Sequence, residues 1–267
     1  MNYAYINLIY GNNNEVFLNT LIFIISLKKT NPKYKVVLCH TNDISNNKLN
    51  ILKKYYDELI LIDYLKIEGI VRERFKNIFT KLKIFELIQF DKILFLDTDM
   101  YVLKNLDHIF EINTPAGMII NSNLDMKHNE KINKSSFTIN AGFMLLSPNN
   151  DTYNQMIKTV KDFDVSEGDL EQEFLSQFLK GWNNISYLYN FQFGLIYVKN
   201  NRGKIYKNTK MNDIFVIHYS AKKKAYHYMN TKSETYSNFK NFYDKWILQF
   251  KKVKKYYSEK GIDIENV

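Results

Sequence analysis

Cysteine, proline and glycine are all scarce in this sequence: its 267 residues include one cysteine, three prolines and nine glycines. A single cysteine, Cys39, excludes an intramolecular disulfide and a zinc site built from cysteines, which fits the cytoplasm or another reducing compartment. Because Cys39 lies in an apolar stretch, we expect it in the core. The sequence also contains no Gly/Ser-rich linker and no internal repeat, so no such feature divides it.

Long hydrophobic runs are missing as well. The most apolar window, VFLNTLIFIISL, holds about a dozen residues, whereas a membrane-spanning helix needs about 20. The first residues, MNYAYINLIYG, carry neither a basic segment nor a small-residue cleavage site, which favours an opening strand over a secretory signal. We therefore expect neither a signal peptide nor a transmembrane segment.

Acidic residues are outnumbered by basic ones, and the formal net charge is +9. The basic residues are scattered, so this excess selects no partner among polyanionic substrates, nucleic acids and anionic membranes. A nucleic-acid-binding protein would cluster aromatic and basic residues on one sheet or groove, whereas the aromatic residues here lie in core-like runs. Nucleic-acid binding stays an alternative function, although we expect no nucleic acid as a partner.

What the sequence does contain is an alternation of strand-like and helix-like segments. Hydrophobic residues make up 45% of the chain, enough to bury a substantial core. The alternation is the mark of a parallel α/β sheet, and strands as apolar as KVVLC, ELILI and KILFL are expected where helices cover both faces. The expected elements are strand 3–9, helix 16–29, strand 35–39, helix 46–55, strand 58–62, helix 78–90 and strand 93–97.

The last of these strands leads into two aspartates, Asp97 and Asp99. Side chains two residues apart lie on one face of a strand, so both carboxylates are expected to project together from its carboxyl end. Open α/β sheets bind ligands at that edge, and adjacent carboxylates repel each other unless they are protonated or share a cation. A hard divalent ion would neutralise them and complete its shell with phosphate oxygens, although Asp-x-Asp also occurs in turn caps and in solvent.

Four blocks, in order, resemble glycosyltransferase family 8, the glycogenin-like and galactinol-synthase-like enzymes that transfer a sugar from a UDP-sugar with retention of configuration. The blocks are TKLKIFELIQFDKILFLDTDMYVLKNLDHIF (80–110), INAGFMLLSP (139–148), EQEFLSQFL (171–179) and HYSAKKKAY (218–226). The resemblance implies a single-domain nucleotide-diphospho-sugar transferase fold of the GT-A type. That fold is α/β, with a Rossmann-like, mostly parallel central sheet and helices on both faces.

The resemblance also implies a metal site formed by Asp97, Asp99 and His218. Two carboxylates and an imidazole suit Mn²⁺ better than an all-oxygen set, with Mg²⁺ as the other candidate. Without the family, His218 would be interpreted as a histidine that ends the strand DIFVI. Lys224 matches the lysine that meets the donor diphosphate, and its alternative is an ordinary solvated lysine run.

Five further positions match family residues that face the donor sugar. Lys81 is implied to lie near the metal, although it could be a surface charge. At Asn140 and Gly142, an amide would bond sugar hydroxyls and a small residue would let the backbone approach; a strand bulge explains Gly142 equally well. Gln172 is implied to lie near the anomeric carbon. Glu171 stands where the family most often has Asp, and its longer arm leaves sugar recognition open.

Two regions depart from the family pattern. In the turn GNNNEVF, Asn12 with Val16 or Phe17 are approximate counterparts of the residues that hold the uracil ring. In the His block, residues that the family favours as Gly, Pro and Trp are replaced, which changes the expected loop around the diphosphate; the replacements are Ala221, Ala225 and Tyr226.

The implied reaction transfers a hexose, glucose or galactose, from a UDP-sugar to a hydroxyl of a glycan, a small polyol or a protein. The metal and Lys224 would stabilise charge on the UDP leaving group, while Gln172 and Glu171 would position the sugar. A glutamine amide is a weak nucleophile, so attack of the acceptor from the leaving-group side is implied. A nucleotidyltransferase and a catalytically silent scaffold of the same fold stay as alternatives.

The sequence after the His block predicts a basic amphipathic helix. We expect residues 1–230 to form the catalytic domain and residues 231–267 to form this helix, packed on the domain. Trp and Phe opposite a lysine-rich face also suit contact with an anionic membrane or a partner, and oligomerisation stays open. The apolar positions recur at spacings of three and four: Phe239, Phe242, Tyr243, Trp246, Ile247, Phe250 and Val253.

Overall fold

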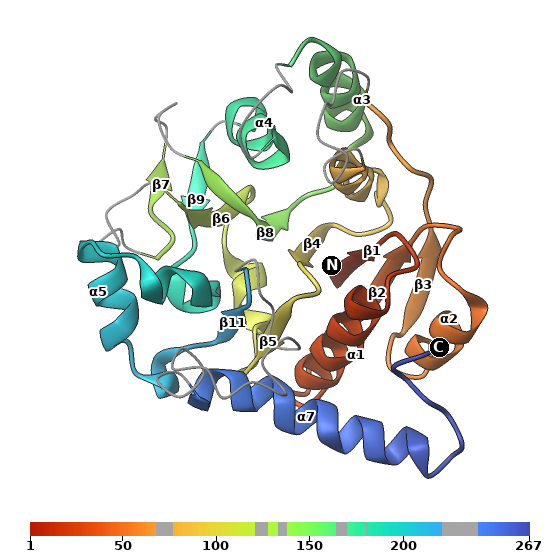
Figure 1. The fold of residues 1–267 in the computed structure, drawn as a ribbon. Coiled ribbons are helices and arrows are strands. Elements are labelled where there is room, and N and C mark those ends of the chain that lie inside the picture. The colour runs from red at the N-terminus through yellow and green to blue at the C-terminus, as the bar shows by residue number, and fades with distance from the viewer. Residues whose placement is uncertain (68–76, 121–127, 133–137, 164–169, 180, 221–239) are drawn as a thin grey trace.

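The computed structural model describes residues 1–267 except 68–76, 121–127, 133–137, 164–169, 180 and 221–239 (Figure 1). Its centre is an eight-stranded sheet with the strand order β3-β2-β1-β4-β8-β6-β9-β7. The strands are β1 (Tyr3–Ile9), β2 (Lys35–His40), β3 (Glu58–Leu61), β4 (Lys92–Leu96), β6 (Ala116–Ile119), β7 (Lys131–Ile132), β8 (Ile139–Leu146) and β9 (Trp182–Asn184).

The first half of the sheet follows the predicted alternation. Strands β3, β2, β1 and β4 pair in parallel, joined in part by helices α1 (Asn14–Lys28) and α2 (Asn46–Leu52). Helix α1 begins two residues earlier than predicted because the Asn13 side chain caps it, accepting hydrogen bonds from the backbone N–H groups of Glu15 and Val16. The predicted α/β fold, with a mostly parallel sheet, is confirmed.

The segment predicted as an α-helix over 78–90 is instead the 3₁₀ helix η2 (Ile78–Glu86). Its residues Phe79, Leu82 and Phe85 are all buried. These residues are spaced three apart, which matches the three residues per turn of a 3₁₀ helix. The tighter winding therefore places all three side chains on the side that faces the sheet.

Strand β8 pairs antiparallel with both β4 and β6, so the sheet becomes mixed beyond β4. A second, three-stranded sheet consists of β10 (Phe191–Gln192), β11 (Val216–His218) and β5 (Met100–Val102). Because β5 follows β4 after a short turn, the chain passes from the large sheet to the small one at residues 97–99.

The large sheet separates two hydrophobic clusters. Alternate residues of β2 face opposite sides, with Val36 and Leu38 in one cluster and Val37 and Cys39 in the other. Helices α1, α2 and α7 (Lys240–Ser258) cover the first side, and η2, α3 (Asn150–Thr159) and α4 (Leu170–Phe178) cover the second (Figure 1). Helix α5 (Asn201–Asn208) lies at the periphery.

Helix α7 packs along α1 through its apolar face. Trp246 and Phe250 are 1% and 2% exposed, so the aromatic side chains that a membrane-facing helix would need already lie in the core. Among the described residues, no helix is both long enough and apolar enough to cross a bilayer.

Candidate functional site

A cavity of about 340 Å³ opens at the carboxyl ends of β1 and β4. Parallel pairing of these strands places both ends at one edge of the sheet, the edge where ligands bind in open α/β sheets. The start of α1 and part of η2 complete the walls. The lining residues are Leu8, Ile9, Tyr10, Glu15, Val16, Asn19, Ile78, Lys81, Phe95, Asp97, Thr98, Asp99 and Glu171.

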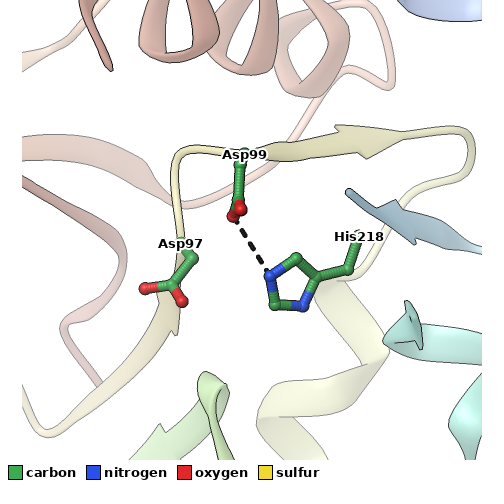
Figure 2. A group of neighbouring side chains, drawn as sticks. All are labelled: Asp97, Asp99 and His218. Carbon is green, nitrogen blue, oxygen red and sulfur yellow. Dashed lines mark ion pairs between the residues drawn. The ribbon is translucent and has the colours of Figure 1, made fainter. Parts of the chain in front are cut away.

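Asp97, Asp99 and His218 converge beside this cavity (Figure 2). One ligand atom from each lies within 4.8 Å of the other two, and His218 Nε2 is 3.1 Å from Asp99 Oδ1. His218 ends β11, whose antiparallel pairing with β5 sets it opposite Met100. Two segments far apart in the sequence, the turn at 97–99 and the end of β11, thus supply one ligand set.

The two aspartates meet for a different reason than the predicted one. Strand β4 ends at Leu96, and residues 98 and 99 form a turn before β5. The two carboxylates therefore converge because the chain turns. They do not lie on one face of a continuous strand, as the prediction assumed. The pairing itself agrees with the prediction.

Gly142 on β8 makes room for this ligand set. A Cβ atom at position 142 would lie 2.7 Å from Asp97 Oδ2 and 2.8 Å from His218 Cε1. Such distances are shorter than van der Waals contact, so any larger residue would displace these side chains. The space between a carboxylate and an imidazole, kept open in this way, and the mixed oxygen and nitrogen ligand set both fit a divalent metal ion.

Lys81, from η2, lies within an acidic cluster on the opposite wall. Its Nζ is 3.3 Å from Asp97 Oδ1 and 3.3 Å from Glu171 Oε1, and it donates to the Ala141 carbonyl at 3.1 Å. Burial by itself lowers the pKa of Lys81, but the carboxylates of Asp97 and Glu171 outweigh burial and raise it. Burial raises the pKa of Glu171, while Lys81 opposes that shift. Lys81 is thus a buried cation, only 8% exposed, and no ordinary surface charge.

The cavity is acidic overall. Its lining includes the four carboxylates of Glu15, Asp97, Asp99 and Glu171, against one ammonium group, that of Lys81, among the residues that the structure describes. A diphosphate would be repelled by this lining unless a cation entered with it. The charge balance and the ligand geometry therefore point to the same kind of added group.

The buried Asn140 and the half-buried Gln172 form a hydrogen-bonded pair near the metal ligands. Gln172 Oε1 accepts hydrogen bonds from Asn140 Nδ2 at 3.1 Å and from the backbone N–H of Ala141 at 3.2 Å. Both accepting positions of that oxygen are used within the protein. Gln172 therefore turns its Nε2, a hydrogen-bond donor, away from β8.

Two predicted site residues do not join this group. Asn12 is exposed and does not line the cavity; its side chain and carbonyl oxygens accept from Lys48 Nζ at 2.8 Å each, and Oδ1 also accepts from the Ser45 backbone N–H. Lys224 lies outside the described residues. Of the two approximate counterparts for the uracil site, Val16 lines the cavity, whereas Phe17 belongs to the core.

Tyr10 and Asn190 lie at the site, although the sequence did not predict them there. Tyr10 directly follows β1 and lines the cavity, and burial raises the pKa of its hydroxyl to about 12. Its position at the carboxyl end of a predicted strand was a usable signal. Asn190 accepts a hydrogen bond at Oδ1 from His218 Nδ1 over 2.8 Å. No motif marks Asn190, since only the pairing of β10 with β11 brings it to His218.

This chain is similar to known proteins over most of its length. The chain is 34% identical to the uncharacterized protein R707 of Acanthamoeba polyphaga mimivirus, over 98% of both chains. It is 26% identical to glycogenin-1 of Caenorhabditis elegans over 85% of its own length, and it spans only 51% of that longer protein. The galactosyltransferase LgtC, solved with donor and acceptor sugar analogs, aligns over 90% of this chain and 95% of its own, with a TM-score of 0.56 and 16% identity.

The similarity to LgtC supports the GT-A type of fold. At 16% identity it is evidence for the fold alone and not for the function. Residues 4–230 match the family described as Glycosyl transferase family 8, a range that contains every predicted site residue. On this match, the chain belongs to glycosyltransferase family 8.

Proposed function

We propose that this chain is a metal-dependent, retaining hexosyltransferase that takes glucose or galactose from a UDP-sugar. One observation carries the proposal: Asp97, Asp99 and His218 converge beside Gly142, where a Cβ would lie 2.7 Å from Asp97 Oδ2 and 2.8 Å from His218 Cε1. The acidic lining of the cavity supports it, because a nucleotide diphosphate could enter only together with a cation.

In this proposal Asp97, Asp99 and His218 hold the metal, with Mn²⁺ preferred over Mg²⁺ because one ligand is an imidazole. The bound ion would supply Lewis-acid stabilisation of the diphosphate leaving group. Lys224 is proposed to add a second positive charge there. Tyr10 and Val16, which line the cavity, are proposed to contact the base.

Lys81, Glu171, Asn140 and Gln172 are proposed to hold the donor sugar. Lys81 and Glu171 are both buried and paired, so they present fixed polar groups and lose little freedom on binding. The oxygen of Gln172 is engaged by two hydrogen bonds, which leaves its Nε2 to donate. We therefore assign Gln172 a positioning role, and the acceptor hydroxyl attacks from the side of the leaving group.

We further propose residues 1–230 as the catalytic domain, with residues 231–267 as an appended segment whose helix α7 packs on it. The acceptor would be a glycan, a small polyol or a protein hydroxyl, including a tyrosine of another copy of the chain.

The test is UDP release from a panel of UDP-sugars, with Mn²⁺ or with EDTA. We expect release with one donor that requires the metal and disappears in Asp97→Asn, while the exposed Asp151→Asn control keeps it. NMR of the product then reports the anomeric configuration. No release with any donor, combined with no UDP binding by calorimetry in Mn²⁺, would contradict the proposal and favour a silent scaffold.

A further inference from the structure

A row of hydrogen-bonded side chains runs behind the metal ligands, from Gln172 through Asn140 and Asn190 to His218. The three residues nearest the metal site are all buried, with exposed fractions of 7% for Asn140, 0% for Asn190 and 4% for His218. The oxygen and nitrogen of a side-chain amide have nearly the same shape. The orientation of each amide therefore follows from a neighbouring group that can only donate or only accept a hydrogen bond. Two backbone N–H groups provide that starting point.

The first step fixes Asn140 and Gln172. The backbone N–H of Gly142 lies 3.1 Å from one end of the Asn140 amide, and a backbone N–H can only donate, so that end is Oδ1. The backbone N–H of Ala141 fixes Oε1 of Gln172 in the same way. Asn140 Nδ2 then faces Gln172 Oε1 at 3.1 Å, and both assignments agree.

The second step fixes Asn190. One end of its amide is 2.8 Å from Asn140 Oδ1. That oxygen only accepts, so Asn190 must direct Nδ2 toward it and Oδ1 toward His218. His218 Nδ1 lies 2.8 Å from this Oδ1, and a hydrogen bond between them requires the proton to be on Nδ1.

The third step concerns the metal side of the imidazole. A neutral histidine with its proton on Nδ1 has a lone pair on Nε2, which is the nitrogen 3.1 Å from Asp99 Oδ1. Asp99 Oδ1 therefore faces the nitrogen that Asn190 does not contact, the nitrogen from which the imidazole could ligate a metal ion. The opposite tautomer would break the bond to Asn190 and would direct an N–H into the space meant for the ion.

We propose that Asn190 is a positioning residue that sets the tautomer of His218 and so keeps Nε2 available as a metal ligand. The inference rests on the proposed function for its purpose, but the tautomer itself is a property of the protein without any ion. Groups that orient a ligating histidine typically change metal affinity by about 10- to 100-fold when they are removed. We expect a loss of that size for Asn190→Leu, which has a similar volume and no acceptor.

The direct test is long-range ¹H–¹⁵N NMR of the metal-free wild-type protein, with His218 assigned by the signals that vanish in His218→Gln. The expected result is a proton on Nδ1 of His218, held by Asn190. A spectrum showing a proton on Nε2 and none on Nδ1 would overturn the inference, even if the protein released UDP in the presence of metal. The expected tautomer without any Mn²⁺ binding or UDP release would instead contradict the proposed function alone.

Two variants add a second readout, the Mn²⁺ affinity measured by electron paramagnetic resonance of the free ion. Asn190→Asp keeps an acceptor for His218 Nδ1 but places an oxygen against Asn140 Oδ1, so it should lose stability and retain the tautomer. Asn183→Leu removes a buried asparagine that donates to the carbonyls of Asn113 and Pro115, outside the row, and should retain both tautomer and affinity. Wild-type affinity in folded Asn190→Leu would refute the positioning role.

Discussion

Two groups of charged side chains at the same edge of the sheet are built in different ways. The metal wall consists of Asp99 and His218, and a carboxylate oxygen there lies 3.1 Å from an imidazole nitrogen. On the lysine wall, formed by Lys81 and Glu171, an ammonium group lies 3.3 Å from the carboxylate, and Asp97 joins the two walls at 3.3 Å from the same ammonium. The lysine wall contains a buried cation of the chain, whereas the metal wall consists of groups that could hold a metal ion.

This difference separates stability from function. Removing a partner from a self-neutralised buried pair leaves an uncompensated charge in the folded state, so the free energy of unfolding should fall. Removing a carboxylate from the metal wall takes away a proposed metal ligand, so metal binding should weaken more than stability.

The largest expected effect is that of Lys81→Met on stability. The substitution leaves Glu171 and Asp97 close together without a cation, and breaking such a buried pair costs about 3–5 kcal/mol in the free energy of unfolding. Urea unfolding in EDTA measures the loss. The double variant Lys81→Met/Glu171→Gln should recover part of it, and a loss no greater than that of the exposed control Lys158→Met would refute the proposed pairing.

Asp99→Asn should show the reverse profile. We expect metal-dependent UDP release to fall by about 10²–10³-fold, the cost of removing one group that stabilises a developing charge. The free energy of unfolding in EDTA should fall by much less than in Lys81→Met. If Asp99→Asn were the more unstable of the two, the contrast between the walls would fail.

Gly142→Ala should inactivate the protein without touching any charge. Its Cβ would lie 2.7 Å from Asp97 Oδ2, and displacing a reacting group by about 1 Å costs about 10²-fold in rate. Mn²⁺ affinity should fall with activity. Gly117→Ala is the matched control, because its Cβ would meet the Trp182 ring no closer than 3.3 Å. Equal activity in the two variants would rule out the steric role of Gly142.

The smallest effect is expected for Glu171→Asp. The shorter arm withdraws the carboxylate from Lys81 Nζ, so positioning of the sugar should weaken by about 10-fold in kcat/KM, within the range of a single contact. The measurement is kcat/KM for each UDP-sugar of the panel, because a change in donor preference would show that this wall reads the sugar. Unchanged Mn²⁺ affinity is the internal control, since the metal wall is intact.

Much of the fold was predictable because it depends on local patterns. Strand β1 has the predicted bounds, and the apolar run 93–96 ends at two acids whose spacing and place at the strand end indicated a cation site. Local capping and winding shifted other boundaries, as at Asn13 and along η2. These differences arise because single hydrogen bonds and buried contacts decide where a helix begins and how tightly it winds.

The sequence by itself determined the α/β alternation, the position of the acids at a strand end, and the four blocks that resemble the family. Only the tertiary structure decided that a turn brings Asp97 and Asp99 together, that Gly142 is required by Asp97 and His218, and that Asn190 contacts His218. Periodicity is a property of neighbouring residues and survives in the sequence. Contacts across β4, β8 and β11 depend on strand pairing over long distances, which no local pattern records.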